Sequence, residues 1–223
     1  MAELINKFLN KEILKITPVL GKPLNEKQEL LLAEYIKLLH KWNQAYNLTA
    51  VREPEDMIKK HIIDSLIILP ILEKDFERQS GPTLVDVGSG AGLPGIPLAI
   101  AQPSWEITLV DSNGKKTGFL TAVKRELGLN NISIINDRVE NVNQTFDAII
   151  CRAFASLKDI VNLTEKLWSE KTCLWAMKGK YPDEELRQLP KSYRVSATYA
   201  LTAPEITDGE RHLLKIIRPN PAL

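Results

Sequence analysis

Apolar residues recur with two different periods along this chain. Over residues 3–69 they return every three or four positions, which is the spacing of one face of an α-helix. From residue 83 to residue 177 short apolar runs alternate with such helical stretches. The change of period predicts a helical N-terminal part followed by strand–helix units, which build a parallel sheet with right-handed crossovers.

Two helices are expected first. Residues 3–16 place Ile5, Leu9, Ile13 and Ile16 on one face, and Pro18 is expected to end this helix because proline cannot donate the next backbone hydrogen bond. Asn25 and Gln28 form a plausible capping box for a second helix that runs to Trp42. Residues 41–49 are rich in polar and aromatic side chains, so we expect a bend there.

A third helix is predicted from Pro54 to about Leu69, ending before Pro70. Its inner face carries four apolar residues, Ile58, Ile62, Leu66 and Leu69. Its other face carries His61, Asp64 and Ser65, close enough to share hydrogen bonds. Without a nucleophile turn or a metal-ligand pattern nearby, we interpret this trio as a structural set that holds the helix against the following domain.

The alternating region predicts five strands and the helices between them. The strands are 83–87, 106–111, 132–136, 146–151 and 172–177, and the helices end at about 101 or span 114–127 and 157–169. Residues 193–201 and 211–217 are two further strands joined without a full helix, so they are expected to pair antiparallel. Polar residues 73–82 are expected to link a helical extension over 1–75 to a main domain over 83–223.

Composition narrows the class of protein. The 29 basic and 28 acidic residues give a net charge of +1, which does not indicate a protein that coats nucleic acid or a membrane. No apolar run approaches the roughly 20 residues that span a bilayer, and the N-terminus lacks a cleavage-site pattern, so a cytoplasmic chain is expected. Cys151 and Cys173 fall in expected core strands without a disulfide or zinc pattern, and we interpret both as buried.

The stretch 84–97 carries the main candidate chemistry. An apolar strand with Asp86 near its end leads into Gly88, Gly90 and Gly92, a turn that lets a ligand touch the main chain. A dinucleotide pattern G-x-G-x-x-G does begin at Gly90, but only after the turn has started. Asp86 would repel a pyrophosphate and attract a cation, and S-adenosylmethionine carries an ammonium and a sulfonium. The pattern resembles motif I of the class I, Rossmann-like methyltransferases.

Further candidates stand where the expected strands end, because ligands bind at the carboxyl ends of an open α/β sheet. Asp111 lies about 20 residues after the glycines, the spacing at which an acid accepts hydrogen bonds from ribose hydroxyls. Residues 137–140 follow the third strand, and Arg152 follows the fourth. A guanidinium at that place suits either the carboxylate of the cofactor or O6 of a guanine, and these two roles stay open.

Five motifs together resemble the bacterial ribosomal RNA small subunit methyltransferase G family, also called the glucose-inhibited division protein B family. They are Asn47-Leu48-Thr49-Ala50-Val51-Arg52, His61-Ile62-Ile63-Asp64-Ser65, residues 86–97, Cys151-Arg152-Ala153-Phe154-Ala155 and Gly209-Glu210-Arg211-His212. The resemblance implies an α/β, Rossmann-like fold with a mostly parallel seven-stranded sheet, a C-terminal antiparallel hairpin and an N-terminal helical extension. It also implies that S-adenosylmethionine contacts Gly88, Leu93, Val139, Glu140 and Arg152. Gly90 of the turn and Asp111, inferred above from the residues themselves, complete the expected cofactor site.

The family's substrate is a guanine N7 in small-subunit (16S) ribosomal RNA. N7 has a lone pair and no proton, so its methylation needs placement rather than a catalytic acid or base, and no metal is expected. The chain has Arg152-Ala153-Phe154-Ala155 where enzymes that methylate exocyclic amines carry Asn/Asp-Pro-Pro-Tyr, which argues against adenine N6.

The candidate RNA contacts are Lys115, Lys116, Lys124, Arg125 and Lys178. The expected partner is the 30S particle or a precursor, and the chain is expected to be a monomer that binds no membrane.

Two other functions stay open from the residues alone. A nicotinamide dehydrogenase would share the fold and the glycine turn, although Asp86 speaks against it. An RNA-binding assembly factor would keep the cofactor pocket without turnover. Binding of S-adenosylhomocysteine against NADH separates the first alternative, and release of labelled methyl into RNA separates the second.

Overall fold

The computed structural model describes residues 2–203 and 209–219. Its centre is a sheet, and in the described residues this sheet has seven strands in the order β3-β2-β1-β4-β5-β7-β6. The strands are β1 Thr83–Val87, β2 Glu106–Val110, β3 Ile132–Ile135, β4 Phe146–Arg152, β5 Trp168–Lys178, β6 Arg194–Ala200 and β7 His212–Ile217. The first five are parallel to one another, and β7 runs antiparallel between β5 and β6. The expected mixed sheet is confirmed.

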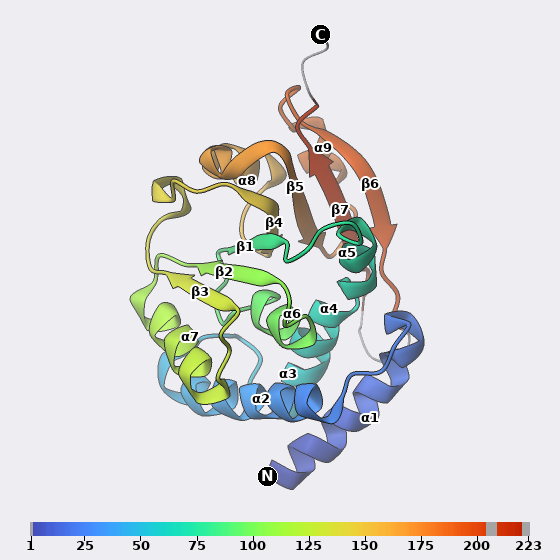
Figure 1. The fold of residues 1–223 in the computed structure, drawn as a ribbon, viewed down its shortest axis with the longest axis vertical. Helices are drawn as coiled ribbons and strands as arrows, with labels where there is room; N and C mark the ends of the chain where they lie inside the picture. Colours follow the sequence, from blue (N-terminus) through green and yellow to red (C-terminus); the bar gives the residue numbers. More distant parts are fainter. Residues whose placement is uncertain (1, 204–208, 220–223) are drawn as a thin grey trace.

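Helices cover both faces of the sheet (Figure 1). The N-terminal ones are α1 Ala2–Leu20, α2 Glu26–Tyr46, α3 Pro54–Met57, the π-helix η1 Ile58–Ile63, α4 Asp64–Leu66 and α5 Leu69–Asp75. The later ones are α6 Gly95–Ala101, α7 Gly114–Leu127, η2 Val139–Asn141, α8 Leu157–Leu163, η3 Glu165–Leu167 and α9 Asp183–Arg187. α2 crosses beneath α6 and α7, on the side of the sheet away from α8.

Alternate residues of the central strands build two separate cores. Along β4, Ala148 and Ile150 join the core shared with α1, α2, α6 and α7, whereas Ile149 and Cys151 join the core under α8. Strand side chains point alternately to opposite faces, so a sheet covered on both faces needs apolar residues at every position. Cys151 and Cys173 are both buried, as expected.

The first two helices extend further than their sequence predicts. The capping box of Asn25 and Gln28 is present as expected. Pro18 lies inside α1 instead of ending it, because it stands in the last turn, where the missing N–H removes a single hydrogen bond. The bend expected over residues 41–49 is wrong for 41–46, which continue α2 until Asn47 caps it with a φ of +49°.

The third predicted helix is broken into shorter pieces. Its four inner residues are buried as expected, but η1 interrupts the α-helix and a turn separates α4 from α5. Pro70 lies in the first turn of α5, so it begins a helix instead of following one. α5 runs to Asp75, into the segment predicted to be a linker. The helix predicted over 157–169 is also too long, because Trp168 already belongs to β5.

The N-terminal helices share one apolar core with the sheet. This core runs from α1 through α2, α5 and α6 to residues of β4, β5 and β7. The division into an extension over 1–75 and a main domain over 83–223 stays a prediction, and residues 1, 204–208 and 220–223 of it lie outside the described part. No helix in the described ranges is long and apolar enough to cross a membrane.

Candidate active site

The glycine turn connects β1 to α6. Gly88, Gly90 and Gly92 have φ values of +66°, +59° and +88°, a region that other residues enter at a cost of about 1–2 kcal/mol. The amides of Gly88 and Ser89 both donate to the carbonyl of Val110 at 2.9 and 3.1 Å. The turn is therefore fastened to the end of β2, and its main chain lies at the edge of the sheet where ligands bind.

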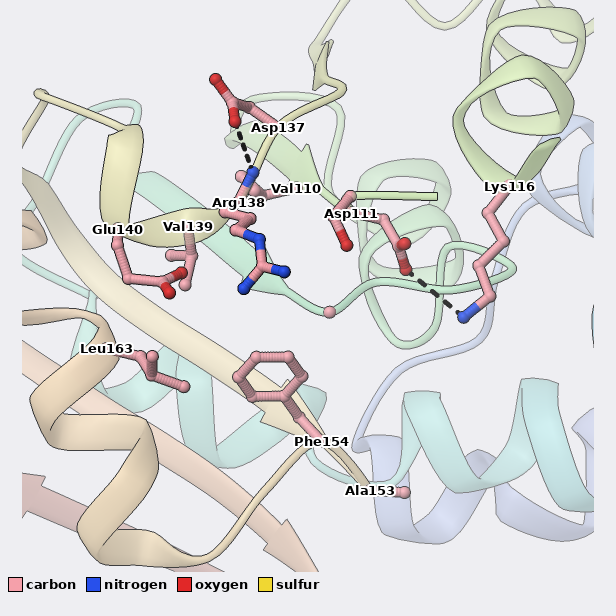
Figure 2. Close-up of a pocket in the computed structure, with 12 residues that line it drawn as sticks. Val110, Asp111, Lys116, Asp137, Arg138, Val139, Glu140, Ala153, Phe154 and Leu163 are labelled. Atoms are coloured by element: carbon pink, nitrogen blue, oxygen red, sulfur yellow. Dashed lines mark hydrogen bonds and ion pairs between the residues drawn. The ribbon is translucent and has the colours of Figure 1, made fainter. Parts of the chain in front are cut away.

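A cavity of about 460 Å³ opens beside this turn (Figure 2). It lies at the carboxyl ends of β1 to β4, where the strand order reverses between β1 and β4. We call it the first cavity. Its lining residues are Gly88, Val110, Asp111, Ser112, Lys116, Asp137, Arg138, Val139, Glu140, Ala153, Phe154 and Leu163. Apolar side chains thus alternate with acids and bases around one space.

Asp111 joins the turn to the first cavity. Its Oδ2 accepts a hydrogen bond from the amide of Gly90, and its Oδ1 accepts one from the amide of Asn113, both at 2.9 Å. Lys116 reaches the same carboxylate, with Nζ 3.6 Å from Oδ2. The Asp111 side chain therefore holds the turn in shape, and each of its oxygens keeps further acceptor capacity toward the cavity.

Asp86 does not line the first cavity. It is fully buried, and its Oδ2 accepts from the amide of Gly95 at 2.9 Å, at the start of α6. Its Oδ1 has no hydrogen-bond partner among the described residues. Burial raises the pKa of Asp86 to about 7. The carboxylate expected to face a bound cation lies beneath the turn instead, because strand alternation turns it toward α6.

Phe154 forms the floor of the first cavity next to the turn. A Cβ added to Gly88 would lie 2.1 Å from Cδ2 of this ring, so the glycine and the phenyl ring are in direct contact. Figure 2 shows the guanidinium of Arg138 pointing toward the same ring. Val139 and Leu163 add apolar surface on the far side.

A second cavity of about 360 Å³ borders the first. Its lining residues are Lys60, Asp64, Arg152, Ala153, Met177, Lys178, Gly179, Leu201, Arg211 and His212. Ala153 lines both cavities and has a left-handed backbone, with φ +49°. Arg152 lines the second cavity and not the first.

Arg152 is held by the π-helix. Its NH1 donates to the carbonyl of Lys60 at 2.9 Å and lies 3.4 Å from Oδ2 of Asp64, and its NH2 lies 3.3 Å from Nδ1 of His61. Arg211 of the loop before β7 binds the other oxygen of Asp64, Nε to Oδ1, at 2.8 Å. One carboxylate thus links two arginines from distant parts of the chain.

His61 supports this arrangement as a neutral ring. Burial, and after it the charge of Arg152, lower its pKa to about 4. Because an arginine NH2 only donates, Nδ1 of His61 must accept, which leaves Nε2–H to donate to Oγ1 of Thr49 at 2.9 Å. The expected set is confirmed for His61 and Asp64, which bind Arg152 at the end of β4, and Asp64 also binds Arg211 before β7. The hydroxyl of Ser65 instead donates to the carbonyl of His61 within the helix.

The expected cofactor residues are only partly brought together. Gly88, Asp111, Val139 and Glu140 line the first cavity, whereas Gly90 reaches it through Asp111, and Leu93 is buried behind the turn. The sequence analysis did not predict that Phe154 lines the first cavity, and it assigned Lys116 to RNA, whereas Lys116 also lines that cavity. Both follow strand ends by a few residues, and that position is the signal that would have found them.

The basic residues expected to bind RNA do not form one patch. Lys116 lies in the first cavity, and Lys178 lies in the second, paired with Glu185 at 2.7 Å. Nζ of Lys124 donates to the carbonyl of Ile132 at 2.6 Å. Of the five, Lys115 and Arg125 are exposed on α7. They remain the surface candidates.

Solved structures share this architecture. The magnesium protoporphyrin IX methyltransferase of Synechocystis PCC 6803, solved with bound S-adenosylmethionine, gives a TM-score of 0.61 at 12% identity, over 83% of this chain and 97% of that chain. A ribosomal protein L11 methylase from Lactobacillus delbrueckii subsp. bulgaricus gives 0.51 at 16% identity, over 67% and 76%. The fold is that of a class I, Rossmann-like methyltransferase.

Sequence comparison gives the family. The family model described as rRNA small subunit methyltransferase G matches residues 28–214, and the chain belongs to this family. The ribosomal RNA small subunit methyltransferase G of Stutzerimonas stutzeri (strain A1501) is 45% identical over 217 residues, 96% of this chain and 98% of the relative. That of Pseudomonas aeruginosa (strain LESB58) is 50% identical over 195 residues, 86% and 87%.

The resemblance seen in the five motifs is therefore confirmed. The chain is an S-adenosylmethionine-dependent methyltransferase that acts on small-subunit ribosomal RNA. This assignment excludes the alternative that the chain is a nicotinamide dehydrogenase.

Proposed function

We propose that this enzyme methylates N7 of a guanine in small-subunit ribosomal RNA, with S-adenosylmethionine bound in the first cavity. The observation that carries the proposal is the first cavity itself. It combines an open glycine turn, the carboxylate of Asp111 and apolar walls at the switch point of the sheet. This is the set of groups that an adenosine with a charged tail requires.

The residues present fit that cofactor. The oxygens of Asp111 each hold one amide and have acceptor capacity left for the ribose hydroxyls. Val139, Leu163 and Phe154 offer apolar faces to the adenine ring. We assign cofactor contact to Gly88, Asp111, Val139 and Glu140. Gly90 and Leu93 shape the turn, and we move Arg152 to the second cavity.

Methylation of guanine N7 requires no catalytic acid or base from the side chains. When bound, S-adenosylmethionine supplies an electrophilic methyl group on a positively charged sulfur. Guanine N7 attacks with a lone pair and loses no proton, so the chain has to orient the base and exclude water. Arg152-Ala153-Phe154-Ala155 stands at the end of β4 in place of the Asn/Asp-Pro-Pro-Tyr motif for exocyclic amines, which favours a ring nitrogen as the target.

The proposal also covers the form of the RNA substrate and the place where the enzyme acts. With a net charge of +1 the chain gains little from counterion release on bare RNA. We infer that a monomer in the cytoplasm recognises the shape of the 30S particle or of a precursor, without membrane contact. Lys115 and Arg125 are the exposed candidates for phosphate contact.

Methyl transfer tests the reaction. The purified chain is incubated with labelled S-adenosylmethionine and small-subunit particles from a strain that lacks it, and the modified base is identified by mass spectrometry. We expect label at N7 of one guanosine. Label on an exocyclic amine contradicts the N7 proposal, and binding of RNA without any transfer supports an assembly factor instead.

Cofactor affinity tests the assigned cavity. Asp111→Ala is expected to weaken S-adenosylmethionine binding by tenfold or more, because it removes charge-assisted hydrogen bonds worth about 1.5–3 kcal/mol. Asn113→Ala is the matched control, since it removes the neighbouring cap of α7 and leaves the carboxylate in place. Equal losses in both variants would mean that Asp111 acts only by holding the turn.

A further inference from the structure

The second cavity lies where the acceptor base of the proposed reaction has to arrive. The reacting atoms of a methyl transfer must come within about 3–3.5 Å, so the base needs a space that joins the cofactor cavity. Ala153 lines both cavities and is the boundary between them. This inference therefore rests on the proposed function and adds to it the group that recognises the base.

The walls of the second cavity combine apolar and charged groups. Ala153, Met177 and Leu201 give it apolar surface suited to a flat ring. Its lysines are already engaged, Lys178 with Glu185 at 2.7 Å and Lys60 with Asp56 at 3.7 Å. Asp64 is the acid among its lining residues, and its side chain is 10% exposed. A carboxylate that reaches a nucleotide pocket is unusual, because it repels phosphate.

We propose that Asp64 recognises the Watson–Crick edge of the target guanine by accepting hydrogen bonds from N1–H and from the N2 amino group. A carboxylate has about four acceptor positions, and Arg152 and Arg211 use one on each oxygen. Guanine presents two neighbouring N–H donors on this edge, which match the two oxygens. Adenine would place its N1 lone pair against the carboxylate, so it is rejected.

The carboxylate is fixed before the base arrives. Nε of Arg211 is 2.8 Å from Oδ1, and NH1 of Arg152 is 3.4 Å from Oδ2. Arg152 is itself held by the carbonyl of Lys60 and by the accepting Nδ1 of His61. An acceptor held on both oxygens needs no reorientation during binding, which lowers the entropic cost of recognition.

The same contact favours the reaction. The N7 lone pair forms the new bond to the methyl carbon, the electron pair of the broken S–C bond stays on sulfur, and no proton is lost. The guanine ring therefore gains one positive charge, and its N1–H becomes a stronger donor. A hydrogen bond from N1–H to Asp64 strengthens in the transition state, which is the condition for an interaction to raise the rate.

Inosine in place of the target guanosine tests the proposal with the unaltered protein. Inosine keeps N7, O6 and N1–H but lacks the N2 amino group. Small-subunit RNA joined from a synthetic segment and assembled into particles supplies both substrates for single-turnover methyl transfer. We expect the wild-type chain to methylate the inosine substrate at least about tenfold more slowly. Equal rates overturn the proposal.

Asp64→Ala then shows whether this residue causes the discrimination. The variant is expected to be slower on guanosine, and its ratio of guanosine to inosine rates should fall to near one. Asp56→Ala is the matched control, because Asp56 is an acid that pairs with a basic residue of the second cavity, Lys60, but does not line the cavity. The control should keep the wild-type ratio. A wild-type ratio in Asp64→Ala means that Asp64 only braces the arginines, and it overturns the proposal.

Two readouts separate this inference from the proposed function. Binding of S-adenosylmethionine without RNA should be unchanged in Asp64→Ala, and a loss there places Asp64 with the cofactor and contradicts the inference. If the wild-type chain transfers no methyl to guanine N7 of the unmodified RNA, the proposed function fails and the inference with it. If N7 is methylated and inosine is not discriminated, the inference alone is wrong.

Discussion

The hydroxyl of Tyr35 donates a hydrogen bond of 2.8 Å to the carbonyl of Ala91. Tyr35 stands in the middle of α2, Ala91 stands in the glycine turn, and both are buried. A helix from the N-terminal part of the chain therefore helps to fix the main chain of the cofactor turn. A buried carbonyl that loses its donor is costly, so this single contact couples the N-terminal helices to the site.

Replacing Tyr35 by Phe tests the coupling. The change keeps the ring and removes the hydroxyl, leaving the carbonyl of Ala91 without this donor, so we expect a loss of about 1–3 kcal/mol in the free energy of unfolding. Urea unfolding measures it. Tyr46→Phe is the control, because Tyr46 lies in the last turn of the same helix and is 45% exposed. Similar values for both variants would show that the hydroxyl of Tyr35 contributes nothing specific.

Gly88→Ala should damage the turn for two separable reasons. The residue has φ +66°, and the new methyl group would meet the ring of Phe154 at 2.1 Å. Backbone strain alone amounts to about 1–2 kcal/mol. We expect a clear loss of unfolding free energy and at least about tenfold weaker binding of S-adenosylmethionine, measured by calorimetry.

The double variant Gly88→Ala/Phe154→Ala separates the two causes. Without the ring the methyl group has room, so the double variant should lose less stability than the sum of the two single variants. The part that does not recover measures the strain at Gly88. Strict additivity would mean that the ring moves aside freely and that its contact with Gly88 carries no energy.

The strands β1 to β4 were predictable because each one is an apolar run bounded by residues that interrupt it. β5 begins at Trp168, four residues before the predicted start, across an exposed polar stretch that no apolar pattern marks. The ends of the helices were not predictable either. Residues 41–46 look polar for a buried helix, yet the rings of Trp42 and Tyr46 pack 5.3 Å apart along α2 and Trp42 also contacts Phe119 of α7. The tertiary contact between Trp42 and Phe119 overrides local preference, and no local pattern reveals it.

The positions of the site residues were predictable, but the directions of their side chains were not. Arg152 stands at the end of β4 as expected, and its orientation depends on Asp64 and His61, about 90 residues earlier in the sequence. For Asp86, too, the position was predicted and the direction of the side chain was not. Its place before the glycines is that of a ligand-facing acid, whereas the alternation of β1 directs it under α6.

His61 makes stability depend on pH. Its pKa is lowered from 6.5 to about 4 in the folded state, so the unfolded chain binds the proton more tightly. The contribution of His61 is therefore complete above pH 6.5 and is lost as the pH falls toward 4, by an amount on the order of 3 kcal/mol. The difference in unfolding free energy between the wild type and His61→Gln should shrink over this range. A constant difference would contradict the buried neutral ring.

Asp86 should act in the opposite direction. Its pKa is raised from 3.8 to about 7, so the folded chain binds the proton more tightly than the unfolded one. This contribution is complete below about pH 4 and is lost as the pH rises through 7. Asp86→Asn cannot titrate but can still accept from the amide of Gly95 through its side-chain oxygen. Relative to the wild type, it should therefore gain unfolding free energy as the pH rises, by an amount on the order of 4 kcal/mol.

The two residues titrate over a shared range, which gives the pair a test that neither single variant offers. Between about pH 4 and 6.5, protonation of His61 destabilises the fold while protonation of Asp86 stabilises it. His61→Gln should therefore make the wild-type profile fall more steeply as the pH rises, and Asp86→Asn should make it rise more steeply. The double variant should return close to the wild-type slope. Urea unfolding at half-unit steps measures all four profiles, and two single variants with slopes shifted in the same direction would show that one of the two groups is not buried in the form described.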